Sequence, residues 1–147
     1  MPTHAETRVV PYTPEQMFTL VADIESYPEF LPWCVSARIN SREDNEIKAD
    51  LAIGYKMFRE HFVSTVRLSP FEEIRVKYEQ GPFKYLNNHW KFKEVGDGSC
   101  EIDFFVDFAF KSSVLQTAMT FFFNEAVQLM IGAFEQRAKT LYQKTSC

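Results

Sequence analysis

The stretch that decides the fold lies near the end of the chain, where residues 113–144 read SVLQTAMTFFFNEAVQLMIGAFEQRAKTLYQK. It contains no proline and one glycine, Gly132, and Ser112 or Ser113 can cap its first turn, so we predict one long helix. Apolar residues recur at spacings of three and four in two adjacent stripes: Leu115, Met119, Phe122, Ala126, Leu129 and Ala133, then Phe123, Val127, Met130 or Ile131, Phe134, Ala138 and Leu141. This apolar arc is wider than the roughly 100° that a helix needs to cover a sheet. Phe121, near the polar side, is a candidate exposed aromatic residue.

The segment before this helix has the pattern of an antiparallel meander. Apolar and charged residues alternate with a period of two, and turn signals such as Gly96-Asp97-Gly98 separate the runs. The predicted strands span about residues 35–42, 46–55, 57–68, 74–78, 86–92 and 100–110. One face of this sheet is apolar and the other is charged, so we expect the sheet to be covered on one side only.

The N-terminal segment predicts a further strand and two short helices. Residues His4 to Val10 alternate as a strand, and Thr13 with Gln16 forms a capping box at the start of the first helix. Ser26-Tyr27-Pro28-Glu29 begins a second, very short helix that reaches about Phe30. The order is therefore strand, two helices, six strands and a long helix, an α+β arrangement in a single domain over residues 1–147.

Composition excludes several classes of protein. The 147 residues carry a net charge of −4, which argues against non-specific binding to DNA or RNA. Cys34, Cys100 and Cys147 are far apart, so neither a disulfide scaffold nor a zinc site is expected. Glu6 and Arg8 stand where a secretory peptide needs an apolar run, and we expect a cytoplasmic protein.

The wide apolar face of the long helix has more than one explanation. It is plain core, or it lines a cavity for a lipid-like ligand between sheet and helix. A membrane-spanning helix over Ser112 to Phe134 is disfavoured, because six polar interruptions would be costly in hydrocarbon. Peripheral membrane contact through the end from Met119 to Phe123 is a further alternative. A filled apolar core and an apolar cavity have the same pattern of residues in a sequence. The sequence therefore does not decide between these two explanations.

Four blocks, in this order, carry a resemblance to a known family: LVADIESYPEFLPWC (20–34), GPFKYLNNHWKF (81–92), DFAFKS (107–112) and FEQRAKTLY (134–142). The chain resembles the coenzyme Q-binding family of START-like, helix-grip proteins, whose bacterial members include ribosome association toxins. The resemblance implies a curved antiparallel sheet of about six to seven strands around a long C-terminal helix, with a hydrophobic tunnel between them. It also implies ubiquinone as the bound ligand and a role in respiratory electron transfer, at the inner membrane or in the cytoplasm. Some relatives are instead described as blocking ribosomal subunit association, and the resemblance does not choose between these roles.

Candidate tunnel residues follow from the inward positions of the strands, the helix and the apolar loop before residue 34. They are Phe30, Trp33, Phe58, Phe62, Leu86, Trp90, Phe104, Val106, Phe122, Ala126, Leu129 and Phe134. Phe30 and Trp33 sit in a proline-stiffened loop, which we expect to act as a lid or as a point of membrane contact, or to plug the end of the sheet. Candidate polar groups for the ligand head are Glu60, Ser64, Asn88 and Arg137. The first three alternate with aromatic residues on the apolar face, where an unpaired polar group is costly, so they bind the head group or pair with each other or with Arg137.

Catalysis is not expected, although START-like folds also include cyclases and other enzymes. Glu60 and His61 point to opposite faces of one strand, and His89 lies on the polar face. No nucleophile elbow, phosphate loop or metal-ligand motif occurs, so we expect no metal and no catalytic cofactor. Two alternatives to a ubiquinone carrier stay open: a regulator that binds a ribosomal subunit and inhibits translation, and a small cyclase- or hydrolase-type enzyme. Acidic residues interleave with the outward basic ones, which favours a solvated surface over an RNA-binding one.

Overall fold

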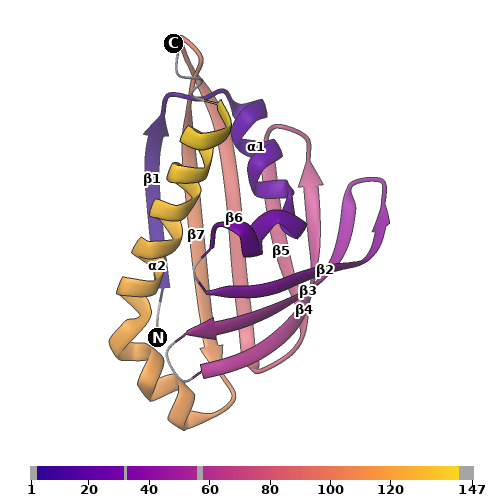
Figure 1. Ribbon diagram of the computed structural model, residues 1–147, viewed down its shortest axis with the longest axis vertical. Helices are drawn as coiled ribbons and strands as arrows, with labels where there is room; N and C mark the ends of the chain where they lie inside the picture. Colours follow the sequence, from indigo (N-terminus) through magenta and orange to yellow (C-terminus); the bar gives the residue numbers. More distant parts are fainter. Residues whose placement is uncertain (1–2, 32, 56–57, 143–147) are drawn as a thin grey trace.

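The computed structural model describes residues 3–31, 33–55 and 58–142, and the side chains of residues 55, 58, 119 and 122 are not described. The chain begins with strand β1 (Thr3–Val10), helix α1 (Pro14–Ala22) and a 3₁₀ helix, η1 (Ile24–Glu29). Six strands follow: β2 (Cys34–Glu43), β3 (Glu46–Tyr55), β4 (Phe58–Ser69), β5 (Glu73–Gln80), β6 (Phe83–Gly96) and β7 (Ser99–Phe110). The long helix α2 (Ser113–Tyr142) completes the fold (Figure 1).

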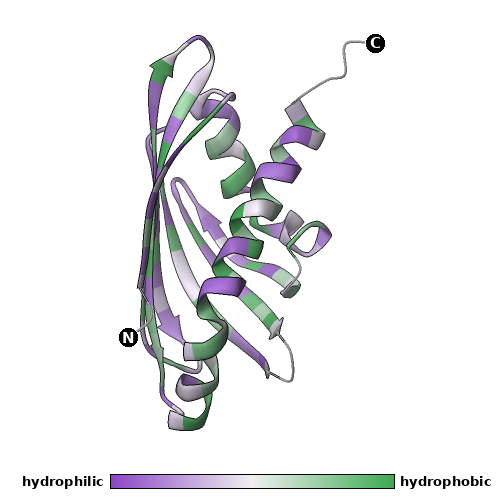
Figure 2. Cartoon of the chain, turned by 90° about the vertical axis from the view of Figure 1, so that its left-hand side faces the viewer, coloured by the Kyte–Doolittle hydropathy of each residue, from purple (hydrophilic) through white to green (hydrophobic). Residues whose placement is uncertain are grey.

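The seven strands form one antiparallel sheet in the order β1-β7-β6-β5-β4-β3-β2. Only β1 leaves the sequential order, because the chain crosses from β1 to the opposite edge through α1 and η1. The sheet curves strongly, and α1, η1 and α2 all lie on its inner side (Figures 1 and 2). The predicted α+β helix-grip architecture is thereby confirmed.

Local sequence signals explain where the helices begin. Thr13 Oγ1 accepts a hydrogen bond from the amide of Gln16 at 3.1 Å, and the Gln16 side chain accepts one from the amide of Thr13 at 2.9 Å. This is the predicted capping box. At the start of α2 the amide of Leu115 donates to Ser112 Oγ at 3.2 Å, which identifies Ser112 as the capping residue. The short helix around Pro28 is a 3₁₀ helix rather than an α-helix.

Polar contacts attach the second half of α2 to the rest of the fold. Arg8 Nη1 of β1 lies 2.7 Å from Glu135 Oε2 of α2, and Tyr142 OH donates to the carbonyl oxygen of Gln16 at 2.9 Å. Arg8 is on the inner face of the sheet, because it pairs in register with the buried Ile102 of β7. The helix is therefore fixed at its C-terminal half by contacts with both β1 and α1.

The sequence predicted a wide apolar face of two stripes on α2, but the buried face is narrower. The buried residues belong to one stripe: Phe123, Val127, Ile131, Phe134 and Ala138. Leu129 of the other stripe is 45% exposed, and Ala126 and Ala133 are only partly buried. The curved sheet meets the helix along one face, so apolar residues beside that face, such as Ala126 and Ala133, are only partly covered, and Leu129 faces solvent.

Gly81, in the turn between β5 and β6, is required by its backbone conformation and by a close neighbour. Its φ is 151°, and a Cβ placed there would stand 2.5 Å from Cβ of Phe62. We expect Gly81→Ala to lower the free energy of unfolding by about 1–3 kcal/mol, as measured by urea denaturation.

Gly132→Ala provides the matched control for this prediction. A Cβ at Gly132 meets nothing within 4 Å, and its position inside α2 favours alanine, so its unfolding free energy should rise by up to about 1 kcal/mol. An undiminished stability of Gly81→Ala would contradict the close approach of the Gly81 and Phe62 backbones.

Candidate ligand-binding site

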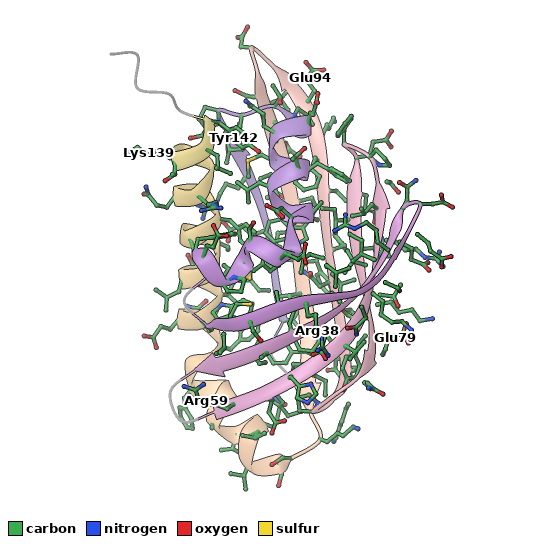
Figure 3. All side chains as sticks on the ribbon, turned by 45° about the vertical axis from the view of Figure 1, so that its right-hand side comes forward. Arg38, Arg59, Glu79, Glu94, Lys139 and Tyr142 are labelled. Atoms are coloured by element: carbon green, nitrogen blue, oxygen red, sulfur yellow. The ribbon has the colours of Figure 1, made fainter. Side chains whose placement is uncertain are left out.

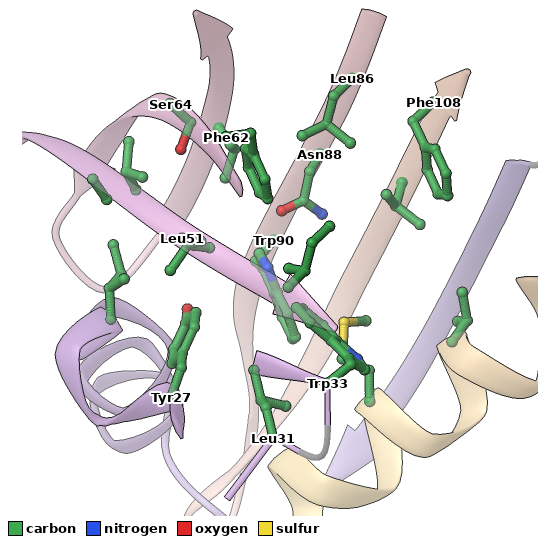
Figure 4. A pocket seen from close by; sticks show the side chains of 18 of the residues that line it. Tyr27, Leu31, Trp33, Leu51, Phe62, Ser64, Leu86, Asn88, Trp90 and Phe108 are labelled. Carbon is green, nitrogen blue, oxygen red and sulfur yellow. The ribbon is translucent and has the colours of Figure 1, made fainter. Parts of the chain in front are cut away.

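An apolar cavity of about 210 Å³ lies between the inner face of the sheet, the α1–η1 segment and α2 (Figure 4). A water molecule occupies about 30 Å³ in the liquid, so this space is much larger than an ordinary packing defect. The sheet contributes Ala49, Leu51, Ile53, Phe62, Ser64, Val66, Ile74, Val76, Phe83, Leu86, Asn88, Trp90, Phe104, Val106, Phe108 and Phe110. The helices and the loop contribute Val21, Ile24, Tyr27, Leu31, Trp33, Phe123, Ala126, Val127, Met130 and Phe134. Among the described residues, none that lines the cavity carries a charged side chain.

Aromatic contacts stiffen the walls of this cavity. Trp90 lies with its ring centroid 4.7 Å from that of Phe104 and 4.9 Å from that of Phe134, in edge-on geometry. Phe83 stacks on Phe110 at 4.9 Å and meets Phe62 edge-on at 5.4 Å. Each such pair stabilises by about 0.5–1.5 kcal/mol beyond its buried area. These contacts stabilise the walls of the cavity.

Two polar side chains of the sheet enter this apolar surface. Ser64 is only 2% exposed, and within the described part of the chain its hydroxyl forms no side-chain hydrogen bond. Asn88 Nδ2 donates to the backbone carbonyl oxygen of Phe105 at 2.8 Å. Both side chains point into the cavity in Figure 4. They are the groups available to orient a ligand head.

Tyr27 of η1 forms part of the opposite wall. Its hydroxyl donates to the backbone carbonyl oxygen of Val21, and its ring meets Phe134 edge-on at 5.5 Å. Burial raises the pKa of Tyr27, so the phenol stays neutral. Burial also raises the pKa of Cys34 and that of Cys100 to about 11, which keeps both thiols protonated and weakly nucleophilic at neutral pH.

Most of the candidate tunnel residues line the cavity. They are Trp33, Phe62, Leu86, Trp90, Phe104, Val106, Ala126 and Phe134, together with the polar candidates Ser64 and Asn88. The side chains of Phe58 and Phe122 lie outside the described residues.

Phe30, Leu129, Glu60 and Arg137 do not line the cavity. Leu129 faces solvent on α2, and Glu60 is exposed although it pairs with the cavity-lining Ile53. Because β4 begins only two residues before it, Glu60 lies at the rim of the inner face, where water still reaches. Arg137 does not pair with the inner polar groups, because its Nη2 lies 3.0 Å from Glu29 Oε1 at the surface. Its guanidinium group stands 5.0 Å from the ring centroid of Phe30.

The loop residues Phe30 and Trp33 do not project from the fold. Phe30 is partly buried against Phe134, with ring centroids 5.3 Å apart, and Trp33 lines the cavity. This placement agrees with the expectation that they close one end of the sheet. It argues against the expectation of a membrane contact made by these two side chains.

Sequence reasoning missed the wall formed by α1, η1 and the turn after them. Val21, Ile24, Tyr27 and Leu31 lie in the first of the four quoted blocks. Ile24 and Tyr27 belong to η1, and a 3₁₀ helix with an internal proline has no α-helical periodicity. The available signal was the concentration of apolar and aromatic residues in that block.

The histidines of the central strands lie away from the cavity. The His89 ring stacks on Phe105 at 5.4 Å and lies 4.0 Å from Asp103, and burial lowers the pKa of His89. His61 Nδ1 is 3.3 Å from Asp50 Oδ1. In the described ranges, no group of three or more His, Cys, Asp or Glu side chains is arranged to hold a metal ion. None of the described helices is long and apolar enough to cross a bilayer.

Comparison with known proteins places this fold and cavity in a family. Residues 10–135 match the family model described as polyketide cyclase / dehydrase and lipid transport. The ribosome association toxin RatA of Rickettsia prowazekii is 38% identical over 137 residues, which cover 90% of this chain and 93% of that protein. The mitochondrial coenzyme Q-binding protein COQ10 homolog B of Xenopus laevis is 32% identical, over 95% of this chain and 59% of that longer protein.

Solved structures agree with this assignment. The solution structure of the 18 kDa protein CC1736 from Caulobacter crescentus is 38% identical, has a TM-score of 0.78, and aligns over 97% of this chain and 99% of that one. The Zhui aromatase/cyclase from Streptomyces sp. R1128 has a TM-score of 0.83 over 96% of this chain and 98% of that one, at 12% identity, and so shows the fold alone. The chain therefore belongs to the polyketide cyclase / dehydrase and lipid transport family.

Proposed function

We propose that this chain binds ubiquinone, or a similar isoprenoid lipid, in its cavity and serves respiratory electron transfer as a non-enzymatic carrier or chaperone. The observation that carries the proposal is the apolar cavity with Ser64 and Asn88 turned into it. A prenylated ring needs an apolar wall for its tail and a few polar groups for its head. The name of the Xenopus laevis relative, a coenzyme Q-binding protein, supports ubiquinone as the ligand.

The energetics of burial favour such a ligand. Removing one five-carbon isoprene unit from water contributes on the order of 3 kcal/mol before ordering costs, which offset much of it. The head group and a few such units therefore suffice for useful affinity without a dedicated sequence motif. The only titratable lining group of the described cavity is the partly buried, neutral Tyr27, which supports a binding role over acid–base catalysis.

The direct test is organic extraction of the natively purified protein, followed by mass spectrometry and ultraviolet absorbance for quinone. Stoichiometric ubiquinone would support the proposal. Absence of quinone, repeated after incubation with quinone-loaded liposomes, would overturn it and leave the ribosome-binding role in first place.

A carrier of this kind has to exchange its ligand with a bilayer, and the first half of α2 provides a surface for that contact. Val114 is 75% exposed and Phe121 is 79% exposed, one heptad apart on the same face of the helix, with the exposed Lys111 just before it. Apolar side chains beside a cation favour an anionic bilayer surface. The corresponding location is the cytoplasm and the inner face of the respiratory membrane.

The double substitution Val114→Ser with Phe121→Ser should reduce binding to liposomes that contain phosphatidylglycerol by about tenfold or more, because the inserted apolar area is lost. Co-sedimentation with the liposomes measures this. The matched control is Val9→Ser with Val95→Ser, since both valines are exposed but lie on β1 and at the end of β6. Equal liposome binding by the two double variants would contradict membrane contact through α2.

A second candidate function is binding to a ribosomal subunit, with inhibition of translation. The RatA relative named for ribosome association, at 38% identity over 90% of this chain, favours it. On the outer face of the sheet, cations lie among acids: Arg67 Nε is 3.1 Å from Glu46 Oε2, and Arg38 Nη2 is 3.6 Å from Asp50 Oδ2 (Figure 3 shows Arg38). Such a mixed face suits a protein partner better than bare RNA. Co-sedimentation with purified subunits tests this role independently of any lipid.

A further inference from the structure

The orientation of the Asn88 amide is fixed by its neighbour. The carbonyl oxygen of Phe105 can only accept a hydrogen bond, so the group 2.8 Å from it must be the amide nitrogen Nδ2. The carbonyl end of the same amide, Oδ1, then points to the other side. Figure 4 shows this oxygen directed into the cavity, towards the space between Phe62 and Trp90.

Oδ1 of Asn88 therefore presents a hydrogen-bond acceptor to whatever fills the cavity. Within the described part of the chain it has no hydrogen-bond donor, and the Ser64 hydroxyl is the other free polar group of the lining. A ligand that fills the cavity displaces water from this oxygen. If the ligand cannot replace that hydrogen bond, the unpaired acceptor lowers the affinity by about tenfold or more.

The two redox forms of a quinone differ in this respect. The oxidised ring carries carbonyl oxygens, which only accept hydrogen bonds, whereas the reduced ring carries two hydroxyl groups, which donate them. Asn88 Oδ1 can accept a hydrogen bond from the hydroxyl of the reduced ring, but it can form none with the carbonyl oxygen of the oxidised ring. The Ser64 hydroxyl both donates and accepts, so it serves either form.

We propose that the cavity selects the hydroxyl-bearing form of its ligand, a ubiquinol or a related prenylated phenol, and that Asn88 determines this preference. The inference rests on the proposed function, since it names the redox form of the ligand of that site. Its consequence is thermodynamic: tighter binding of the reduced form raises the midpoint potential of the bound couple, by about 30 mV for each tenfold difference in affinity.

Anaerobic calorimetric titration of the full chain with decylubiquinone and decylubiquinol tests the proposal. We expect decylubiquinol to bind about tenfold more tightly, the effect of one additional hydrogen bond in place of an unpaired acceptor. Asn88→Leu keeps a similar size and suits the apolar inner face, so it should fold. In this variant the two forms should bind equally, because the quinol loses its hydrogen-bond acceptor and the quinone no longer leaves an acceptor unpaired.

Ser64→Ala is the matched control, because it removes the other polar group of the lining. It should weaken the binding of both forms and leave their ratio unchanged. Equal affinities of the wild-type chain for the two forms, or a ratio that Asn88→Leu does not change, would overturn the inference while the carrier function stands. If the folded wild-type chain bound neither form, the proposed function would fail and the inference with it.

Discussion

Replacement of Ala126 by tryptophan should lower the affinity for decylubiquinone at least about 100-fold while the chain stays folded. Ala126 lines the cavity from α2 and is only partly buried, so an indole at this position can enter the open space without displacing packed atoms. A 100-fold loss corresponds to about 2.7 kcal/mol, less than the gross burial free energy of one isoprene unit. Calorimetry measures the affinity, and urea denaturation with an unchanged m-value shows that the fold is intact.

Leu129→Trp is the matched control, with the same new side chain nearly one turn further along the same helix. Leu129 is exposed and does not line the cavity, so the added indole stays in solvent and the affinity should remain that of the wild type. Retention of full affinity by Ala126→Trp would place the ligand outside the cavity. Loss of affinity in both variants would indicate a general effect on α2 rather than occupation of the site.

The order of the helices and strands could be predicted because it depends on local sequence signals, and the structure contains the expected caps and turns. The Thr13 and Gln16 capping box, and the turn at Gly96-Asp97-Gly98, depend on a few neighbouring residues. All three turn residues have positive φ, a conformation that glycine and aspartate tolerate at a hairpin. Strand β3 has the predicted bounds, because its alternation reports a face that is buried on one side.

The face of α2 could not be predicted to one side chain, since an apolar residue does not by itself reveal whether a partner surface reaches it. Leu129 and Phe134 are equally hydrophobic in the sequence, but the curved sheet reaches only Phe134. The position of Glu60 at the exposed rim, and not in the cavity, could not be predicted for a related reason. Its place in the alternation correctly put it on the inner face, but the register cannot show that solvent reaches that end of β4.

Part of the site was predictable and part was not. Ser64 and Asn88 were recognisable because polar residues interrupt an apolar alternation, and both line the cavity. Tyr27 and Leu31 belong to an irregular segment, so their contribution to the wall depends on a path of the chain that no periodicity encodes. The cavity itself is a vacancy, and only the three-dimensional arrangement distinguishes it from a filled core.

Truncation of Phe134 to alanine should lower the free energy of unfolding by about 3–5 kcal/mol, the largest stability effect that we expect from one substitution in α2. Phe134 is buried where α2 meets the sheet and η1. Its ring contacts Trp90 at 4.9 Å, Phe30 at 5.3 Å and Tyr27 at 5.5 Å between centroids. The existing cavity is adjacent, and the stiff aromatic walls cannot collapse to fill the added space, so the cost should lie near the upper end of this range.

Phe121→Ala separates this effect from a change in helix propensity, because it makes the same substitution in the same helix at a side chain that is 79% exposed. It should change the unfolding free energy by no more than about 0.5 kcal/mol. Urea denaturation at constant m-value measures both variants. A small loss for Phe134→Ala would mean that η1 and the sheet close over the vacated volume, so that the walls are adaptable and the cavity owes its shape to a ligand rather than to packing. A loss of the expected size, with Phe121→Ala neutral, would identify the aromatic contacts of Phe134 as the link that holds α2 against the wall of the binding site.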